Sequence, residues 1–139
     1  MKMGLKEKKA AREFQTEQFE VLKKKIFSAA KFEFEIEVDW DSLSVDNYAH
    51  LYNQTWTQIY FEPMIIAFSK MCADDFSQEA IQADLKKVVI QNIGDIHNSS
   101  KYSSYSDGVL TLNHSPIANA ENQIEERAAA LQDTVEDAL

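Results

Sequence analysis

The amino-acid sequence predicts an α+β domain in which helices pack on one face of a mainly antiparallel four-stranded sheet. Three observations predict this fold. Residues 32–41 alternate apolar and acidic side chains, an Asp-Gly pair separates two strand-like segments, and several long segments place apolar residues at helical spacing. We expect the element order α-β-α-α-β-β-β-α in a single domain over residues 1–139, because no linker or repeat divides the chain.

Two helices are expected in the first half of the chain. Residues 5–30 contain good helix formers without Pro, with apolar residues near helical spacing. Helical spacing returns over 45–73, where Pro63 is expected to kink or break the helix because it lacks a backbone N–H. The segment after Pro63 is apolar on nearly all sides, so we expect it at the centre of the fold.

Two further helices are expected later in the chain. Ser77 is the expected N-cap of a short helix over 78–87, with Phe76 and Ile81 placed as a hydrophobic staple. The last helix begins after a cap at Asn119 or Asn122 and has apolar residues three and four apart as far as residue 139.

The expected strands include one clear hairpin. Residues 32–41 read FEFEIEVDWD, a period of two that gives one apolar and one acidic face, and residues 88–93 form a second strand. Strands 101–106 and 109–114 flank Asp107-Gly108, the favoured pair for a type I′ turn. This turn places Tyr105 opposite Leu110 and Ser104 opposite Thr111. Because a half-solvated sheet is typical of antiparallel pairing, we expect mainly antiparallel strands.

The composition excludes several classes of protein. The chain has 139 residues, is 45% hydrophobic and contains one cysteine. Its longest apolar run, 64–68, is far below the roughly 20 residues needed to cross a bilayer, so we expect no membrane association. Because no export signal is visible and Cys72 has no intrachain partner, we expect a cytoplasmic location.

The net charge of −9 is unevenly distributed. Residues 1–31 carry nine basic and four acidic side chains, whereas the remaining residues carry five basic and 19 acidic ones. The acidic part should repel nucleic acid and anionic membranes, so nucleic acid is not an expected partner. The opposite charges of the two parts favour self-association instead.

The acidic face of residues 32–41 is the candidate partner-binding site. Its carboxylates are Glu33, Glu35, Glu37, Asp39 and Asp41. Like charges on one strand face destabilise the free protein, and a basic partner would relieve that repulsion. The alternative interpretation is a solvated sheet face without a partner.

Aromatic residues at helical spacing suggest a candidate pocket. Tyr52, Trp56 and Tyr60 share one face of the middle helix and could line a small-molecule site. The alternative interpretation is that they are core residues, in which case the tyrosine hydroxyls need polar partners.

The sequence offers little support for catalysis. No metal-binding motif is present, and the nearest approach to a ligand set is Asp95, His97 and His114. We predict no catalytic residue, metal or cofactor: Cys72 has acidic neighbours, which is typical of an inert thiol, and the three glycines form no nucleotide-binding loop.

Acidity and the absence of catalytic motifs together predict a non-enzymatic protein-interaction or binding module that binds a protein partner, which could be a second copy of itself. One alternative is an immunity or inhibitor protein that neutralises a basic nuclease or another nucleic-acid-binding protein. A second alternative is a small enzyme or metal site around Asp95, His97 and His114.

Overall fold

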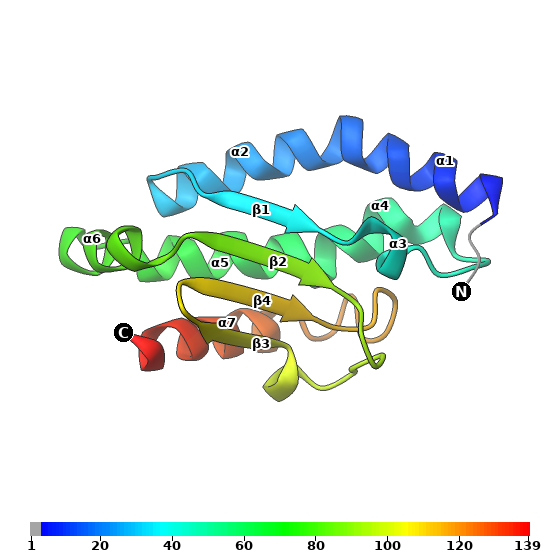
Figure 1. The fold of residues 1–139 in the computed structure, drawn as a ribbon. Coiled ribbons are helices and arrows are strands. Elements are labelled where there is room, and N and C mark those ends of the chain that lie inside the picture. The colour runs from blue at the N-terminus through cyan, green and yellow to red at the C-terminus, as the bar shows by residue number, and fades with distance from the viewer. Residues whose placement is uncertain (1–3) are drawn as a thin grey trace.

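The computed structural model describes residues 4–139, which contain a four-stranded sheet with helices against one face (Figure 1). The strands are β1 (Glu35–Val38), β2 (Lys87–Gln91), β3 (Ser103–Ser106) and β4 (Val109–Asn113). The α-helices are α1 (Leu5–Glu13), α2 (Phe19–Ala30), α3 (Trp40–Leu43), α4 (Tyr52–Trp56), α5 (Glu62–Met71), α6 (Asp75–Asp84) and α7 (Ile124–Ala138). The α+β class is therefore confirmed. Within residues 4–139, no helix is long and apolar enough to cross a membrane.

The sheet is mixed and mostly parallel, so the prediction of a mainly antiparallel sheet was wrong. The strand order is β1-β2-β4-β3, with β1 parallel to β2, β2 parallel to β4, and only β3 antiparallel to β4. Helices α4 and α5 lie between β1 and β2 in the chain and return it to start a parallel strand (Figure 1). Alternating hydrophobicity indicates only that one face of a sheet is exposed to solvent. Here the parallel strands have such a face because the packed helices lie on the other side of the sheet.

Strand β1 is much shorter than the ten residues expected. It pairs with β2 from Glu35 onward, because β2 begins at Lys87, directly opposite Glu35. At the other end, the Asp39 carboxylate accepts a hydrogen bond from the Ser42 backbone N–H at 3.3 Å and caps α3, which ends the strand. The alternation of burial nevertheless continues from residue 32 to residue 40, beyond both ends of the strand.

The N-terminal helix runs over residues 5–30, as expected, but one turn is π-helical. This turn, η1 (Phe14–Gln18), joins α1 to α2 and buries Phe14 completely. Phe14 packs edge-on against Trp56 with ring centroids 5.1 Å apart and lies 5.8 Å from Phe61. A wider π-helical turn thus directs a large aromatic residue into the core.

The middle helix continues past Pro63 with a second π-helical turn. This turn, η3 (Thr57–Phe61), follows α4 and leads directly into α5, where Pro63 stands in the first turn. Pro is tolerated there because the first backbone N–H groups of a helix have no helical partner. Helix α5 contacts both α2 and α7, which confirms the expected central position (Figure 1). Residues 45–51 contain only the short 3₁₀ turn η2 (Ala49–Leu51).

The expected caps of two helices were wrong. Helix α6 begins three residues early because Asp74, not Ser77, is the N-cap: the Asp74 carboxylate accepts a hydrogen bond from the Ser77 N–H at 2.9 Å. Phe76 therefore lies within the first turn and is 82% exposed, so it forms no staple with Ile81. The N-cap of α7 is Gln123.

The predicted hairpin is confirmed in turn and in register. Tyr105 lies opposite Leu110 and Ser104 opposite Thr111. Asp107 has φ 55° and Gly108 has φ 80°, the left-handed values that a type I′ turn requires at both central positions. The short 3₁₀ turn η4 (Ser99–Lys101) precedes the hairpin.

Candidate functional site: the open face of the sheet

One face of the sheet is left uncovered by the packed helices (Figure 1). Its side chains occupy alternate strand positions and include Glu35, Glu37, Lys87, Val89, Val109 and Thr111. The two glutamates are exposed and the other four residues are half-buried. We call this surface the open face. It combines carboxylates along β1 with β-branched side chains on β2 and β4.

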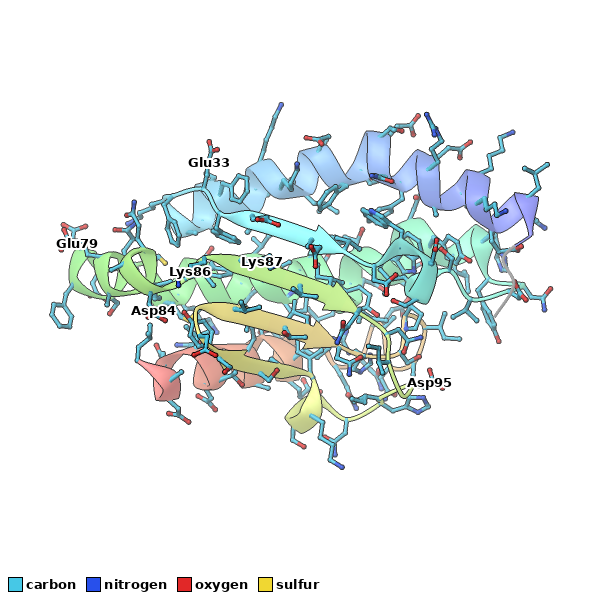
Figure 2. The ribbon with its side chains drawn as sticks, viewed as in Figure 1. Glu33, Glu79, Asp84, Lys86, Lys87 and Asp95 are labelled. Carbon is cyan, nitrogen blue, oxygen red and sulfur yellow. The ribbon has the colours of Figure 1, made fainter. Side chains whose placement is uncertain are left out.

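A lysine on the neighbouring strand lies beside the acidic edge of the open face. Lys87 on β2, labelled in Figure 2, stands opposite Glu35, and its Nζ lies 3.8 Å from Oε1 of Glu37. The Glu37 side chain remains 57% exposed, so this pair is worth little in water and leaves the carboxylate free to bind another cation. No pattern in the sequence singles out Lys87, because the register between β1 and β2 cannot be read from either strand alone.

The five predicted carboxylates do not form one row. Glu33, Glu35 and Glu37 are exposed, and Glu35 and Glu37 belong to β1. Asp39 and Asp41 instead belong to the cap and first turn of α3. They line a separate polar hollow of about 360 Å³ beside the carboxyl ends of β1 and β2, together with Ser42, Ser44, Val45 and Asn92. Of the five predicted carboxylates, only Glu35 and Glu37 therefore lie on the open face, and Glu33 is exposed just before β1.

The candidate pocket residues lie in the core. Tyr52, Trp56 and Tyr60 are at most 1% exposed, and the rings of Tyr52 and Trp56 stack with centroids 4.3 Å apart. Each tyrosine hydroxyl donates to a backbone carbonyl, Tyr52 to Val45 at 2.8 Å and Tyr60 to His114 at 2.6 Å. Burial, with the charges of two nearby carboxylates, raises the pKa of Tyr52 to about 12. The structure thus places these residues in the core and not around a ligand pocket.

The candidate metal residues are split between the surface and the interior. His97 Nε2 lies 3.4 Å from Oδ2 of Asp95, and both side chains are exposed. His114 is fully buried, with Nδ1 2.6 Å from the Ser115 carbonyl oxygen and its ring edge against Tyr102. Burial lowers the pKa of His114, because it disfavours the charged imidazolium. Within residues 4–139, no group of three His, Cys, Asp or Glu residues is placed to hold a metal ion.

A buried arginine is the most unusual interior group. Arg127 is completely buried, and its guanidinium donates to the carbonyl oxygens of Asn119 at 2.9 Å, Ala120 at 2.8 Å and Gln58 at 3.1 Å. No ion pair to Arg127 occurs in the part of the chain that the structure describes. Its role is to tie the loop before α7 to the middle helix, and helical spacing alone gave no sign of it.

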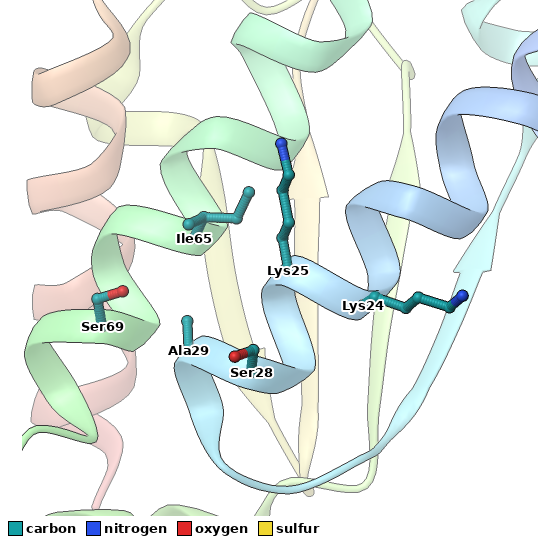
Figure 3. A pocket seen from close by; sticks show the side chains of 6 residues that line it. All are labelled: Lys24, Lys25, Ser28, Ala29, Ile65 and Ser69. Atoms are coloured by element: carbon teal, nitrogen blue, oxygen red, sulfur yellow. The ribbon is translucent and has the colours of Figure 1, made fainter.

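A shallow basic hollow lies between α2 and α5 (Figure 3). It measures about 570 Å³ and is lined by Lys24, Lys25, Ser28, Ala29, Ile65 and Ser69. Figure 3 shows Lys25 extending along the gap between the two helices while Lys24 points away from it. Because both lysines and both serines are exposed, no polar group is held in place there to recognise a ligand.

Comparison with known proteins gives no relative. No protein family matches the chain, and no curated protein or solved structure matches it significantly.

Proposed function

We propose that this chain is a non-enzymatic protein-interaction module whose open face binds a basic protein surface. The observation that carries the proposal is the open face itself: four strands present one side without a covering helix, and its outer strand β1 carries Glu35 and Glu37 beside Glu33. A sheet face with an apolar centre and an acidic edge offers both area to bury and charge to orient a partner.

The two parts of the open face would contribute differently to binding. Val89, Val109 and Thr111 are half-buried, so a partner lying over them would remove apolar surface from water. The glutamates lie at the rim, where charge mainly raises the rate of association and selects against acidic partners. The module would therefore bind basic partners quickly, with a strong dependence on salt.

One specific version of this function is an inhibitor of a basic nuclease or another nucleic-acid-binding protein. Such a partner carries a cationic surface made for phosphates, and the carboxylates of the open face would occupy it. We place the interaction in the cytoplasm, because Cys72 is buried and burial raises the pKa of its thiol, which is typical of an inert cysteine that needs no oxidising compartment.

A matched pair of charge reversals tests the proposal. The first variant carries Glu33→Lys, Glu35→Lys and Glu37→Lys, and the control carries Glu125→Lys, Glu126→Lys and Asp133→Lys on α7, where all three side chains are also exposed. Partners are captured from cells that express the chain, purified, and their association rates measured with each variant.

We expect a basic partner whose association rate falls at least tenfold with the β1 variant and changes less than about twofold with the α7 variant. An equal loss with both variants would show that only net charge matters. Unchanged binding by the β1 variant would exclude the open face.

A further inference from the structure

The exposed face of α1 combines one apolar side chain with several cations. Leu5, Lys8, Lys9 and Arg12 are spaced three and four residues apart, so they share a face of the helix, and all four are exposed. Leu5 is 82% exposed. The opposite face is buried in the protein through Glu7, Ala11 and Phe14. Helix α1 thus presents a basic surface with an apolar residue at its tip, which we call the head.

A complementary surface lies between α6 and the end of α7. A cleft of about 250 Å³ is lined by Phe76, Ser77, Ala80, Ile81, Glu136 and Leu139. Phe76 is 82% exposed and Leu139 52% exposed, so the cleft has a large apolar rim. The acid Glu136 lines the cleft, and the exposed acid Glu79 lies three residues from Phe76 on α6. We call this apolar cleft with acidic borders the tail.

The head and the tail lie at opposite ends of the molecule. Figure 1 shows α1 beginning at one end of the structure and α6 lying at the other, and Figure 2 shows Glu79 at the α6 end. Within residues 4–139, Leu5 and Phe76 are the most exposed large apolar side chains. The two surfaces are therefore too far apart to meet within one copy, but they can meet between copies.

We propose that the head of one copy docks into the tail of a second copy. Leu5 enters the cleft beside Phe76 and Leu139, while the basic side chains of the head lie near Glu79 and Glu136. Apolar contact and charge attraction then act together, since each surface combines an apolar part with a charged part and the two charges are opposite. This contact uses neither β1 nor the open face, so it goes beyond the proposed function.

The geometry of this contact determines the assembly that it forms. A head-to-tail contact is heterologous, and each added copy leaves one head and one tail free. Such contacts form a closed ring only when the rotation between copies closes, and because head and tail lie at opposite ends of the molecule we expect an open series that lengthens with protein concentration. Added salt shortens it, because the charges around the cleft are exposed and screened.

The test uses two single variants and one control. Leu5→Ser disables the head, Phe76→Ser disables the tail, and Ile93→Ser removes a side chain that is 59% exposed but belongs to neither surface. All three side chains are exposed, so the fold should survive each change, and near-ultraviolet circular dichroism checks that it does. Sedimentation velocity over a concentration series at low salt measures the assembly.

We expect the unmodified chain and Ile93→Ser to form a concentration-dependent series, and each of the other two variants to stay monomeric. A mixture of Leu5→Ser and Phe76→Ser should form a dimer that grows no further. The intact head of Phe76→Ser docks into the intact tail of Leu5→Ser, and the dimer then has no intact surface left. Isologous contact between two heads or two tails cannot give this pattern.

Three results would overturn the proposal. One is a monomeric unmodified chain at every concentration and salt level. Another is association of Leu5→Ser or Phe76→Ser alone as strong as that of the unmodified chain. The third is an equal loss of association in Ile93→Ser.

Discussion

The Tyr60 hydroxyl donates a hydrogen bond of 2.6 Å to the backbone carbonyl oxygen of His114, and both residues are completely buried. Tyr60 belongs to the π-helical turn η3, and His114 directly follows β4. The bond therefore joins the central helix to the end of a central strand. A buried carbonyl needs such a donor because no water reaches it.

Replacing Tyr60 by Phe keeps the ring and removes only this donor. We expect the free energy of unfolding to fall by about 1 to 3 kcal/mol, because the His114 carbonyl is then buried without a partner. Urea unfolding measures the change. Tyr48→Phe is the control, since Tyr48 is 38% exposed and should change stability by less than about 0.5 kcal/mol.

Arg127→Met should destabilise the fold by about 3 kcal/mol, because three carbonyl groups lose a charged donor at once. Methionine fills a similar volume and relieves the cost of burying a charge, so the loss stays below the sum of three separate bonds. Arg12→Met removes an exposed arginine and serves as the control for unfolding experiments. Equal free energies of unfolding for Arg127→Met and Arg12→Met would show that the hydrogen bonds of Arg127 do not stabilise the contact between the middle helix and the loop before α7.

Gly108 and Gly94 provide a matched pair for testing a close contact. Both have positive φ, 80° and 84°, so alanine is strained at either position. A Cβ at Gly108 would lie 2.7 Å from the Asp84 carbonyl oxygen, whereas one at Gly94 would meet nothing within 4 Å. Gly94→Ala should cost about 1 kcal/mol and Gly108→Ala at least twice that. Comparable thermal shifts for both would contradict the tight contact at the hairpin turn.

The buried imidazole of His114 should make stability depend on pH. Burial lowers its pKa in the folded state, so below about pH 6.5 the unfolded chain binds a proton that the folded chain does not. The free energy of unfolding therefore falls as the pH falls from about 7 to about 5. His114→Gln should show a shallower fall when unfolding is measured over this range. Parallel curves for the two proteins would remove His114 as the cause.

Local signals in the sequence predicted most elements correctly. The Asp107-Gly108 pair fixed the turn and register of the hairpin because the required positive φ values are a property of those two residues. The N-terminal helix was predicted equally well, since its apolar spacing is continuous over residues 5–30.

Strand direction and the site needed information that no local pattern holds. Whether β2 runs parallel to β1 depends on the helices between them in the chain. The alternation of apolar and acidic residues in β1 indicates only which side of the strand faces solvent. The same pattern could not show that Asp39 leaves the strand to cap α3, or that Lys87 stands beside Glu37. Only Glu35 and Glu37 of the five predicted carboxylates lie on the open face for that reason.

Adjacent valines in β2 allow the most direct test of the open face. Val88 is completely buried under the helices, whereas Val89 is half-buried on the opposite side. Methyl-resolved NMR can follow both side chains while a purified basic partner is added. We expect the methyl signals of Val89 and Val109 to shift on binding and those of Val88 to stay in place. Shifts confined to Leu5 or Leu139, with Val89 unchanged, would contradict binding at the open face.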